Sequence, residues 1–537
     1  MDMLWNGWGD PAKAAPLPDA VIGLLGQLLG VAPRDGRALA LDDIHVPESP
    51  LDAAASGALA DAVGGAAHVR TDADSRIRHT RGKSTPDLLR IRAGDVTDVP
   101  AAVVLPASHD EVLAVLRACA RHRLAVVPFG GGTSVVGGLA PVPARHRDVV
   151  AVDLRRMKDL LDLDPVSRMA TLQPGLRAPQ AEALLAEHGF TLGHFPQSYE
   201  WATIGGFAAA RSSGQSSAGY GRFDDMVLGL TVATPEGTLD IGRAPRSAAG
   251  PDLRQLILGS EGAFGVITAV TVRVRPVPAA RHYEGWRFAS FAEGATALRR
   301  LAQDGPLPTV LRLSDETETL VGLAEPAAIG SAGAERNTGC LAVAGYEGTE
   351  EETAHRRERA AAVLSACGGT HLGAGPGERW AHGRYAAPYL RDSLLDAGAF
   401  AETLETAAFW SRLPGLYTAV REALTGTLTE AGTPPLVMCH ISHVYENGAS
   451  LYFTAVGAQG KDPVAHWAPA KRAANEAVLA AGGTISHHHG VGTDHRDWYV
   501  REAGPLGVEA LRAVKRRLDP EGLLNPGILL PVDGPAG

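Results

Sequence analysis

The 537-residue chain is poor in cysteine. It has four, Cys119, Cys340, Cys367 and Cys439, and they are far apart in the sequence. Disulfide frameworks and structural zinc sites normally use closely spaced pairs such as C-x-x-C. The spacing excludes both classes, and we expect reduced thiols in a cytoplasmic protein.

The chain also lacks an excess of basic residues and a long hydrophobic run. Its 50 Lys and Arg are outnumbered by 60 Asp and Glu, giving a formal net charge of −10, so we expect no nucleic-acid partner. The start, MDMLWNGWGD, has neither the basic segment nor the apolar core of a signal peptide. The apolar run 21–31 is shorter than the roughly 20 residues that span a bilayer. We expect a soluble protein, and a peripheral contact with lipid and a homodimer are compatible with this composition.

What remains is an ordinary globular balance, with 45% hydrophobic and 20% charged residues. The length predicts three to four domains of ordinary size, or two large domains. We place boundaries to give an N-terminal segment (1–95), a first domain (96–278), a second domain (279–505) and a C-terminal segment (506–537). The pattern mixes both kinds of element, an α+β class. We predict strands at 101–105, 124–127, 149–152, 170–172, 226–234 and 266–274, and helices at 20–29, 50–62, 108–122, 179–188, 351–366, 399–413, 467–481 and 508–518.

The basic run 79–84, HTRGKS, is similar to the end of a phosphate-binding P-loop. That motif needs a glycine five residues before Gly82, and Ile77 stands there. We therefore expect a basic loop that packs on the first domain.

Glycine-rich loops are the strongest feature of the first half. Five glycines lie among the nine residues 130–138, directly after a predicted strand. Freed backbone N–H groups make such a loop either an anion site or a structural turn. The spacing is not the Rossmann G-x-G-x-x-G. Three further loops, at 196–206, 211–225 and 259–268, are rich in small and hydroxyl residues, and the four together could line one long ligand.

In order, these loops read P-F-G-G-G-T-S, P-Q-S-Y-E-W-A-T-I-G-G, R-S-S-G followed by Y-G-R-F-D-D, and G-S-E-G-A-F-G-V-I-T. The set resembles the FAD domain of the vanillyl-alcohol-oxidase superfamily, and within it the alkyldihydroxyacetonephosphate synthase family, from Trp5 to Asn525. The resemblance implies a PCMH-type FAD-binding domain, an α+β substrate (cap) domain and a C-terminal helix that returns to the FAD domain. Thr133 stands where some superfamily members attach flavin through histidine, so we expect non-covalent FAD.

The resemblance also implies which residues bind FAD. They are Pro128, Phe129, Gly130, Gly131, Gly132, Thr133, Ser134, Gly138, Pro196, Gln197, Ser198, Thr203, Gly205, Gly206, Arg211, Ser212, Ser213, Gly214, Tyr220, Gly221, Asp225, Glu261, Gly262, Gly265, Val266 and Ile267.

Three consecutive histidines, His487, His488 and His489, stand out in the second half. On a regular strand, successive side chains alternate faces, so all three cannot ligate one metal, and we expect no metal. The cluster either satisfies buried backbone groups or moves protons and binds an anion. The synthase family carries the same run at its active site.

The family's chemistry is unusual for a flavoprotein because it makes no net redox change. A proton leaves C1 of an acyl ester of dihydroxyacetone phosphate, the carboxylate departs, flavin N5 holds the sugar phosphate, and a fatty alcohol adds to give an ether. The resemblance implies Tyr452 as the base and Arg312 and Arg412 as ligands of the anionic head. The alternatives for these residues are a packed strand aromatic and ordinary salt bridges.

A second function uses the same residues. A flavin dehydrogenase of a 2-hydroxy acid or another alcohol would need arginines for a carboxylate and a histidine as base. The sequence therefore predicts a synthase-like transferase of a lipid with an anionic head, with the oxidoreductase as the alternative.

Overall fold

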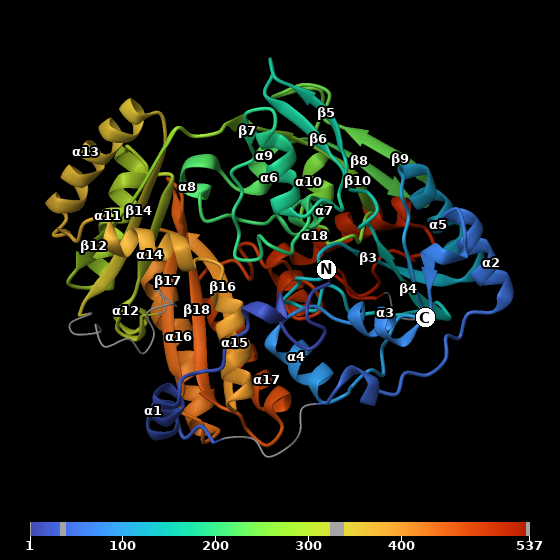
Figure 1. Cartoon of the computed structure of the whole chain (residues 1–537), viewed down its shortest axis with the longest axis horizontal. Helices are drawn as coiled ribbons and strands as arrows, with labels where there is room; N and C mark the ends of the chain where they lie inside the picture. Colours follow the sequence, from blue (N-terminus) through green and yellow to red (C-terminus); the bar gives the residue numbers. More distant parts are fainter. Residues whose placement is uncertain (1, 33–38, 323–337, 533–537) are drawn as a thin grey trace.

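The first half of the chain folds into two main sheets and a small two-stranded sheet, with helices packed around them (Figure 1). The computed structural model describes residues 2–32, 39–322 and 338–532. One sheet has the order β1 (Val69–Arg70), β2 (Ala102–Val104), β4 (Asp148–Asp153), β3 (Leu124–Phe129). The other has the order β5 (Leu160–Asp164), β6 (Met169–Leu172), β10 (Val266–Arg273), β8 (Val227–Thr234), β9 (Gly237–Ile241).

The helices of this half follow local signals that the sequence shows. Ser108 caps α5 (His109–His122) by accepting a hydrogen bond from the backbone N–H of Glu111. Apolar residues at helical spacing, Val112, Val115 and Leu116, are buried against the sheet together with α2 (Ala53–Ala62). The remaining elements are α1 (Asp19–Leu29), α3 (Ala73–Arg78), α4 (Thr85–Arg92), α6 (Ala178–Ala186), β7 (Phe190–Thr191), α7 (Ile204–Ala210), α8 (Ser217–Tyr220), α9 (Phe223–Met226), α10 (Arg254–Ile257) and β11 (Arg275–Pro276).

The second half is built on one antiparallel seven-stranded sheet (Figure 1). Its order is β15 (Thr370–His371), β12 (Ala280–Phe288), β14 (Cys340–Gly348), β13 (Val310–Ser314), β17 (Leu436–Val444), β18 (Gly448–Ala458), β16 (Ala399–Phe409). Its helices are α11 (Phe291–Asp304), α12 (Glu316–Val321), α13 (Glu350–Ala366), α14 (Gly375–Gly383), α15 (Ala387–Asp396), α16 (Leu413–Glu430) and α17 (Pro463–Ala480).

Alternation along β18 separates the core of this half from its functional face. Leu451, Phe453 and Ala455 are buried in one cluster with residues of α11, α13, α16 and α17. Tyr452 and Thr454 point the other way and line a cavity. The sheet is therefore a wall, with helices behind it and the candidate site in front.

The chain returns to the first half at its end, as the fold prediction required. Gly504, with φ of 73°, divides α18 (Arg496–Leu518) into two segments, and the second begins near the predicted start of the helix at 508. Val508 is buried in the cluster of the five-stranded sheet, and Leu524 forms a bridge with Val126 of β3. The predicted C-terminal return is confirmed.

One predicted helix, at 399–413, is wrong. Residues 399–409 form β16, an eleven-residue strand that pairs with β18 along its whole length. Ala and Glu favour helix, but Phe400 and Leu404 face the helical layer while Ala401 and Thr403 face the cavity, a period of two. Pro414 lies in the first turn of the next helix, α16.

The basic run 79–84 packs on the first glycine loop, as predicted. The backbone N–H of Lys83 donates to the carbonyl of Ser134 (2.6 Å), and its ammonium donates to the carbonyls of Leu4 and Trp5 (2.8 and 3.0 Å). Elsewhere in the described chain, the four cysteines are free thiols, and no helix is long and apolar enough to cross a bilayer.

Candidate active site

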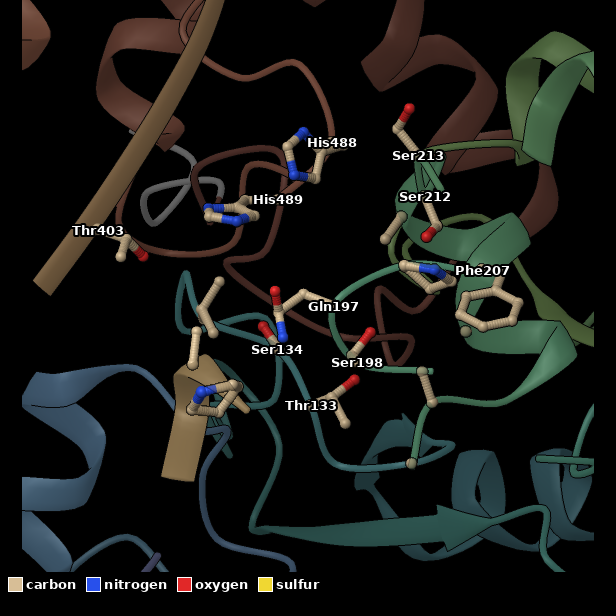
Figure 2. Close-up of a pocket in the computed structure, with 18 of the residues that line it drawn as sticks. Thr133, Ser134, Gln197, Ser198, Phe207, Ser212, Ser213, Thr403, His488 and His489 are labelled. Atoms are coloured by element: carbon tan, nitrogen blue, oxygen red, sulfur yellow. The ribbon is translucent and has the colours of Figure 1, made fainter. Parts of the chain in front are cut away.

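A cavity of about 400 Å³ lies where the two halves meet. The glycine loops of the first half form one wall and the functional face of the seven-stranded sheet forms the other, with α14 and α15 at the side. Figure 2 shows His488 and His489 on the far side of the open space from Thr133 and Ser198, with Gln197 reaching between them. A cavity of this size is typical of a cofactor or substrate site.

The glycines in these loops allow the loops to pack on each other. A Cβ at Gly131 would lie 2.1 Å from the carbonyl oxygen of Trp201 in the second loop. Gly262, with φ of +79°, would place a Cβ 2.8 Å from the ring of Pro128. The loops therefore hold one another in place as a preformed cradle.

Whether FAD fits the cradle depends on the hydrogen-bond donors that the cradle leaves unused. The backbone N–H groups of Gly131, Gly132 and Thr133 donate to no other described residue. Gln197 Nε2 is buried without a hydrogen-bond partner in the described chain, as is Gln215 Oε1. Backbone donors suit a pyrophosphate, and amide side chains suit the polar edge of a flavin ring, so these residues fit FAD.

Most of the residues predicted to bind FAD line this cavity. They are Pro128, Phe129, Gly130, Gly131, Gly132, Thr133, Ser134, Gly138, Pro196, Gln197, Ser198, Thr203, Gly205, Gly206, Ser212, Ser213, Glu261, Gly262, Gly265 and Ile267. That they bind FAD stays a prediction.

Six residues of that set do not line the cavity, and the structure gives them supporting contacts instead. Arg211 donates to the carbonyl of Leu258, and Tyr220 donates to Glu347. Asp225 accepts from the backbone N–H of Arg222. The other three are Gly214, which approaches the backbone of Phe195, Gly221, which lies against Asp225, and Val266, which is a core residue of β10.

The histidine run forms a loop whose backbone is held by a buried carboxylate. Glu405 of β16 accepts hydrogen bonds from the backbone N–H groups of His487, His488 and His489 (2.8, 3.1 and 2.8 Å) and from the hydroxyl of Ser486 (2.7 Å). Burial raises the pKa of Glu405, but the electrostatic interaction and hydrogen bond with His488 outweigh it and hold the pKa well below its usual range. Glu405 is an anionic anchor that the sequence did not single out.

A second buried carboxylate holds the other side of the loop. Glu261, from the fourth glycine loop, accepts from the backbone N–H groups of Val491 and Gly492 (2.8 and 3.0 Å). Burial raises its pKa to about 7. The histidine loop is therefore fastened by one carboxylate from each half of the molecule.

His488 and His489 line the cavity next to Tyr452. Tyr452 lies edge-to-face with His489 (5.5 Å between ring centroids) and stacks on His440 (4.9 Å). Burial raises the pKa of Tyr452 to about 12, and burial lowers the pKa of His489 to about 3. At neutral pH, Tyr452 is thus a protonated phenol beside an uncharged imidazole.

Arg312 also lines the cavity, and it belongs to a buried cluster. Glu318 accepts from Arg312 and from His440 Nδ1 (2.9 Å). Burial raises the pKa of Glu318, but the charges of His440 and Arg312 bring it down to about 2. Arg312 Nε has no hydrogen-bond partner among the described residues and remains free for a ligand.

Arg412, which the resemblance implied as a second ligand of the anionic head, is placed differently from Arg312. It is an exposed residue at the start of α16, beside Gly482, and it does not line the cavity. The structure instead brings Arg384 and Arg391 to the site, and Arg384 Nε and Nη1 are buried with no hydrogen-bond partner in the described chain. The segment 384–391, RYAAPYLR, carries no motif that we recognised, so sequence reasoning missed both.

His487 is buried behind the cavity wall rather than on it. Its Nε2 bonds to the hydroxyl of Tyr445 (2.7 Å) and its Nδ1 to His488 Nδ1 (2.9 Å). His443, which sequence reasoning also missed, lines the cavity and bonds to the hydroxyls of Ser217 and Ser213 (2.7 and 3.1 Å).

The sheet face of the cavity changes character along the strands. One row across the sheet consists of His440, Tyr452 and Glu405, which pair directly. Four residues further along β18, or about 13 Å, the row consists of Leu436, Val456 and Ala401. Leu394 of α15 and Leu29 of α1 pack against this second row. Of these two rows, His440 and Tyr452 line the cavity at one end and Val456 and Ala401 at the other, so the cavity is polar at one end and apolar at the other.

Two family models match the chain. The FAD binding domain covers residues 100–241, and the C-terminal domain of FAD linked oxidases covers residues 277–529. With the fold and the cradle, they define an FAD-dependent enzyme of the linked-oxidase class, and FAD is its cofactor.

Relatives narrow this class. Alkyldihydroxyacetonephosphate synthase from Trypanosoma brucei brucei is 36% identical over 481 residues, covering 86% of this chain and 78% of the relative. The synthase from Dictyostelium discoideum is 32% identical over 577 residues, covering 98% and 93%. A solved structure of an alkyldihydroxyacetonephosphate synthase superposes with a TM-score of 0.81 at 29% identity, covering 98% of both chains. The chain belongs to the alkyldihydroxyacetonephosphate synthase family.

Proposed function

We propose that this enzyme exchanges the acyl group of an acyl-dihydroxyacetone phosphate for a long-chain alcohol, giving an ether lipid and a free fatty acid. The observation that supports this most is the graded cavity. Its polar row, with three arginines nearby, suits a phosphate-bearing head, and its apolar row suits an alkyl chain. A small 2-hydroxy acid would leave the apolar end unused.

The side chains divide the work. Arg312 and Arg384 bind the phosphate through their spare donors. The proton at C1 is acidified by the neighbouring ketone, and Tyr452 together with His488 removes it. The imidazole of His489 has a low pKa and is therefore neutral next to Tyr452 and His488. It does not compete with the arginines for the phosphate.

The residues of the cradle would hold FAD non-covalently, and the bound cofactor would supply the chemistry that stabilises C1 after the carboxylate has left. The ester C–O bond breaks, the ether C–O bond forms with the alcohol oxygen, and no electron acceptor is consumed. Tyr452 is protonated in the free site, so it acts as a base only if its own proton moves to a neighbouring imidazole.

Product analysis tests the proposal. The purified holoenzyme is incubated with palmitoyl-dihydroxyacetone phosphate and ¹⁸O-labelled hexadecanol, without any electron acceptor. We expect an ether product that retains the label and one equivalent of palmitate. Acid precipitation of the same sample should release the flavin into the supernatant. If the label stays in the alcohol while D-lactate or glycolate reduces an added dye, the alternative, a 2-hydroxy-acid dehydrogenase, is correct.

The setting of the reaction is also a proposal. The free thiols support a cytoplasmic enzyme. Helix α1, which packs at the apolar end of the cavity, exposes Leu24 and Leu28 (52% and 69%), which supports a peripheral contact with lipid. Sedimentation with liposomes tests that contact, and the sedimentation coefficient of the enzyme tests for a homodimer.

A further inference from the structure

Behind the cavity wall, a chain of hydrogen bonds leads from His488 through His487 to Tyr445, at the edge of the β17–β18 hairpin. His488 Nδ1 lies 2.9 Å from His487 Nδ1, and His487 Nε2 lies 2.7 Å from the hydroxyl of Tyr445. His488 lines the cavity, whereas His487 is buried and does not. Tyr445 is half-buried at the β17–β18 hairpin, followed by the exposed Glu446 and Asn447.

We propose that His487 and Tyr445 form a proton relay that carries the substrate's C1 proton from His488 to solvent. This inference rests on the proposed function, which supplies the proton. The side chain of Tyr445 does not line the cavity. It therefore takes no part in binding FAD, the phosphate or the alkyl chain, and those functions do not explain its position.

The direction of the hydrogen bonds follows from Glu405. Its carboxylate lies 3.3 Å from His488 Nδ1, so this nitrogen carries the hydrogen. His487 Nδ1 must then accept, which leaves the hydrogen of His487 on Nε2, where it is donated to the Tyr445 oxygen. Every link points outward, as a relay requires.

Transfer along this chain balances. When His488 Nε2 takes a proton from the cavity, its Nδ1–H passes to His487 Nδ1. The Nε2–H of His487 passes to the Tyr445 oxygen, and the original hydroxyl proton of Tyr445 leaves to water. Burial raises the pKa of Tyr445 to about 12 against the opposing charge of Arg222, so the phenol is neutral before and after the transfer.

A metal ion is the competing use of these imidazoles. His443, His487 and His488 each offer a nitrogen within 4.8 Å of the others. However, the rings of His443 and His487 are stacked at 5.1 Å with an angle of 23° between them. Lone pairs lie in the ring plane, so stacked rings direct them side by side rather than at one ion. The contact of 2.9 Å between His487 and His488 is a hydrogen bond.

Exchange of the C1 proton with solvent tests the relay without the second half of the reaction. Acyl-dihydroxyacetone phosphate is incubated in D₂O with the holoenzyme at low buffer concentration, without alcohol, and C1 deuterium is measured by mass spectrometry. Tyr445→Phe removes one hydroxyl and should slow exchange by at least about tenfold. His487→Gln should do the same, and imidazole in the buffer should restore the rate in both. Flavin absorbance and melting temperature verify that each variant is folded.

Tyr417→Phe is the matched control. It removes another tyrosine hydroxyl, which bonds to Asp315 and Arg421 behind the sheet, and should leave exchange unchanged. If Tyr445→Phe exchanges the C1 proton at the wild-type rate, or if imidazole does not restore a slowed rate, the relay is wrong. The proposed function is unaffected by either result. If the wild-type enzyme neither exchanges the proton nor forms the ether, both the relay and the proposed function are wrong. Loss of exchange in Tyr417→Phe as well would show a general loss of structure and would also contradict the relay.

Discussion

Tyr452 shows how a single residue is given its chemistry by position. It points into the cavity because β18 alternates, and its ring lies between His440 and the histidine loop. Burial keeps its phenol protonated, and imidazoles lie around it as proton acceptors. The sequence identified Tyr452 only through a family resemblance, and the neighbours that control its proton come from other strands.

Replacing Tyr452 by Phe should therefore abolish turnover and leave FAD bound. The change removes the hydroxyl but keeps the ring that stacks on His440. We expect at least about a hundredfold loss in kcat, with an unchanged flavin absorbance spectrum. Full activity in the variant would show that Tyr452 does not handle the C1 proton.

Arg384→Lys should weaken binding of the substrate's phosphate. Lysine keeps the charge but loses the planar fork, and Arg384 has two buried N–H atoms with no hydrogen-bond partner in the described chain. We expect KM for the acyl substrate to rise about 10- to 100-fold, as a lost charged hydrogen bond costs about 1.5–3 kcal/mol, with little change in kcat.

Arg412→Lys is the control for that measurement. Arg412 was predicted at the site but lies exposed beside Gly482, so this change should leave KM unaltered. A higher KM in Arg412→Lys than in Arg384→Lys would reverse our assignment. Arg412 was placed at the site through the family resemblance rather than through the predicted helix before it.

At the scale of elements, β16 connects the core to the chemistry. The same strand provides Phe400 to the helical layer, Thr403 to the cavity and Glu405 to the histidine loop. Its sequence favours helix, and only pairing with β18 decides otherwise, so propensity alone could not predict it. The strands and helices whose caps and period are local, such as α5, were predictable.

Glu405→Gln tests the anchoring of the histidine loop. The amide is isosteric but uncharged, so the hydrogen bonds from three backbone N–H groups and Ser486 weaken. We expect a loss of about 2 kcal/mol in the free energy of unfolding, measured by urea denaturation, and a lower kcat because His488 shifts.

Glu402→Gln is the matched control on the same strand. Glu402 is also buried, but it accepts from the backbone N–H of Thr85, away from the histidine loop. It should lose stability while keeping kcat. Equal effects of both changes on kcat would show that Glu405 has no special part in placing the loop.

At the scale of the whole molecule, the site exists only where the two halves meet. The four glycine loops could be recognised in the sequence because each is local and has a steric reason for its glycines. Arg384, Arg391, Glu405 and His443 could not, because what gives them a role lies far away in the sequence, as His487 does from Glu405 and Ser213 from His443. The polarity of the cavity also depends on strand register, which the sequence does not show.

Many buried histidines make the folded molecule sensitive to acid. Burial lowers the pKa of five of them strongly among the described residues: His194, His443, His487, His489 and His495. Below their unfolded pKa of about 6.5, the unfolded chain binds protons that the folded chain does not. The free energy of unfolding therefore decreases as the pH is lowered. Asp87, Glu261 and Asp315, whose pKa values burial raises to about 6, 7 and 6, oppose this.

The histidines outnumber those carboxyls, so the net effect of acid is destabilising. Between pH 6.5 and pH 5, we expect the unfolding free energy of the holoprotein to fall by roughly 2 kcal/mol per pH unit, measured by urea denaturation at each pH. A constant or rising stability over this interval would mean that these histidines are charged in the folded protein.

The central claim is that the cradle holds FAD against a cavity built for acyl-dihydroxyacetone phosphate. The most direct measurement is the anaerobic absorbance spectrum of the purified protein, recorded before and after addition of this substrate and, separately, of D-lactate or glycolate. We predict a yellow protein whose flavin band bleaches with the acyl substrate and recovers when hexadecanol is added, with no response to either hydroxy acid. A colourless protein that takes up no FAD, or a flavin reduced by the hydroxy acids and indifferent to the acyl substrate, would contradict this account.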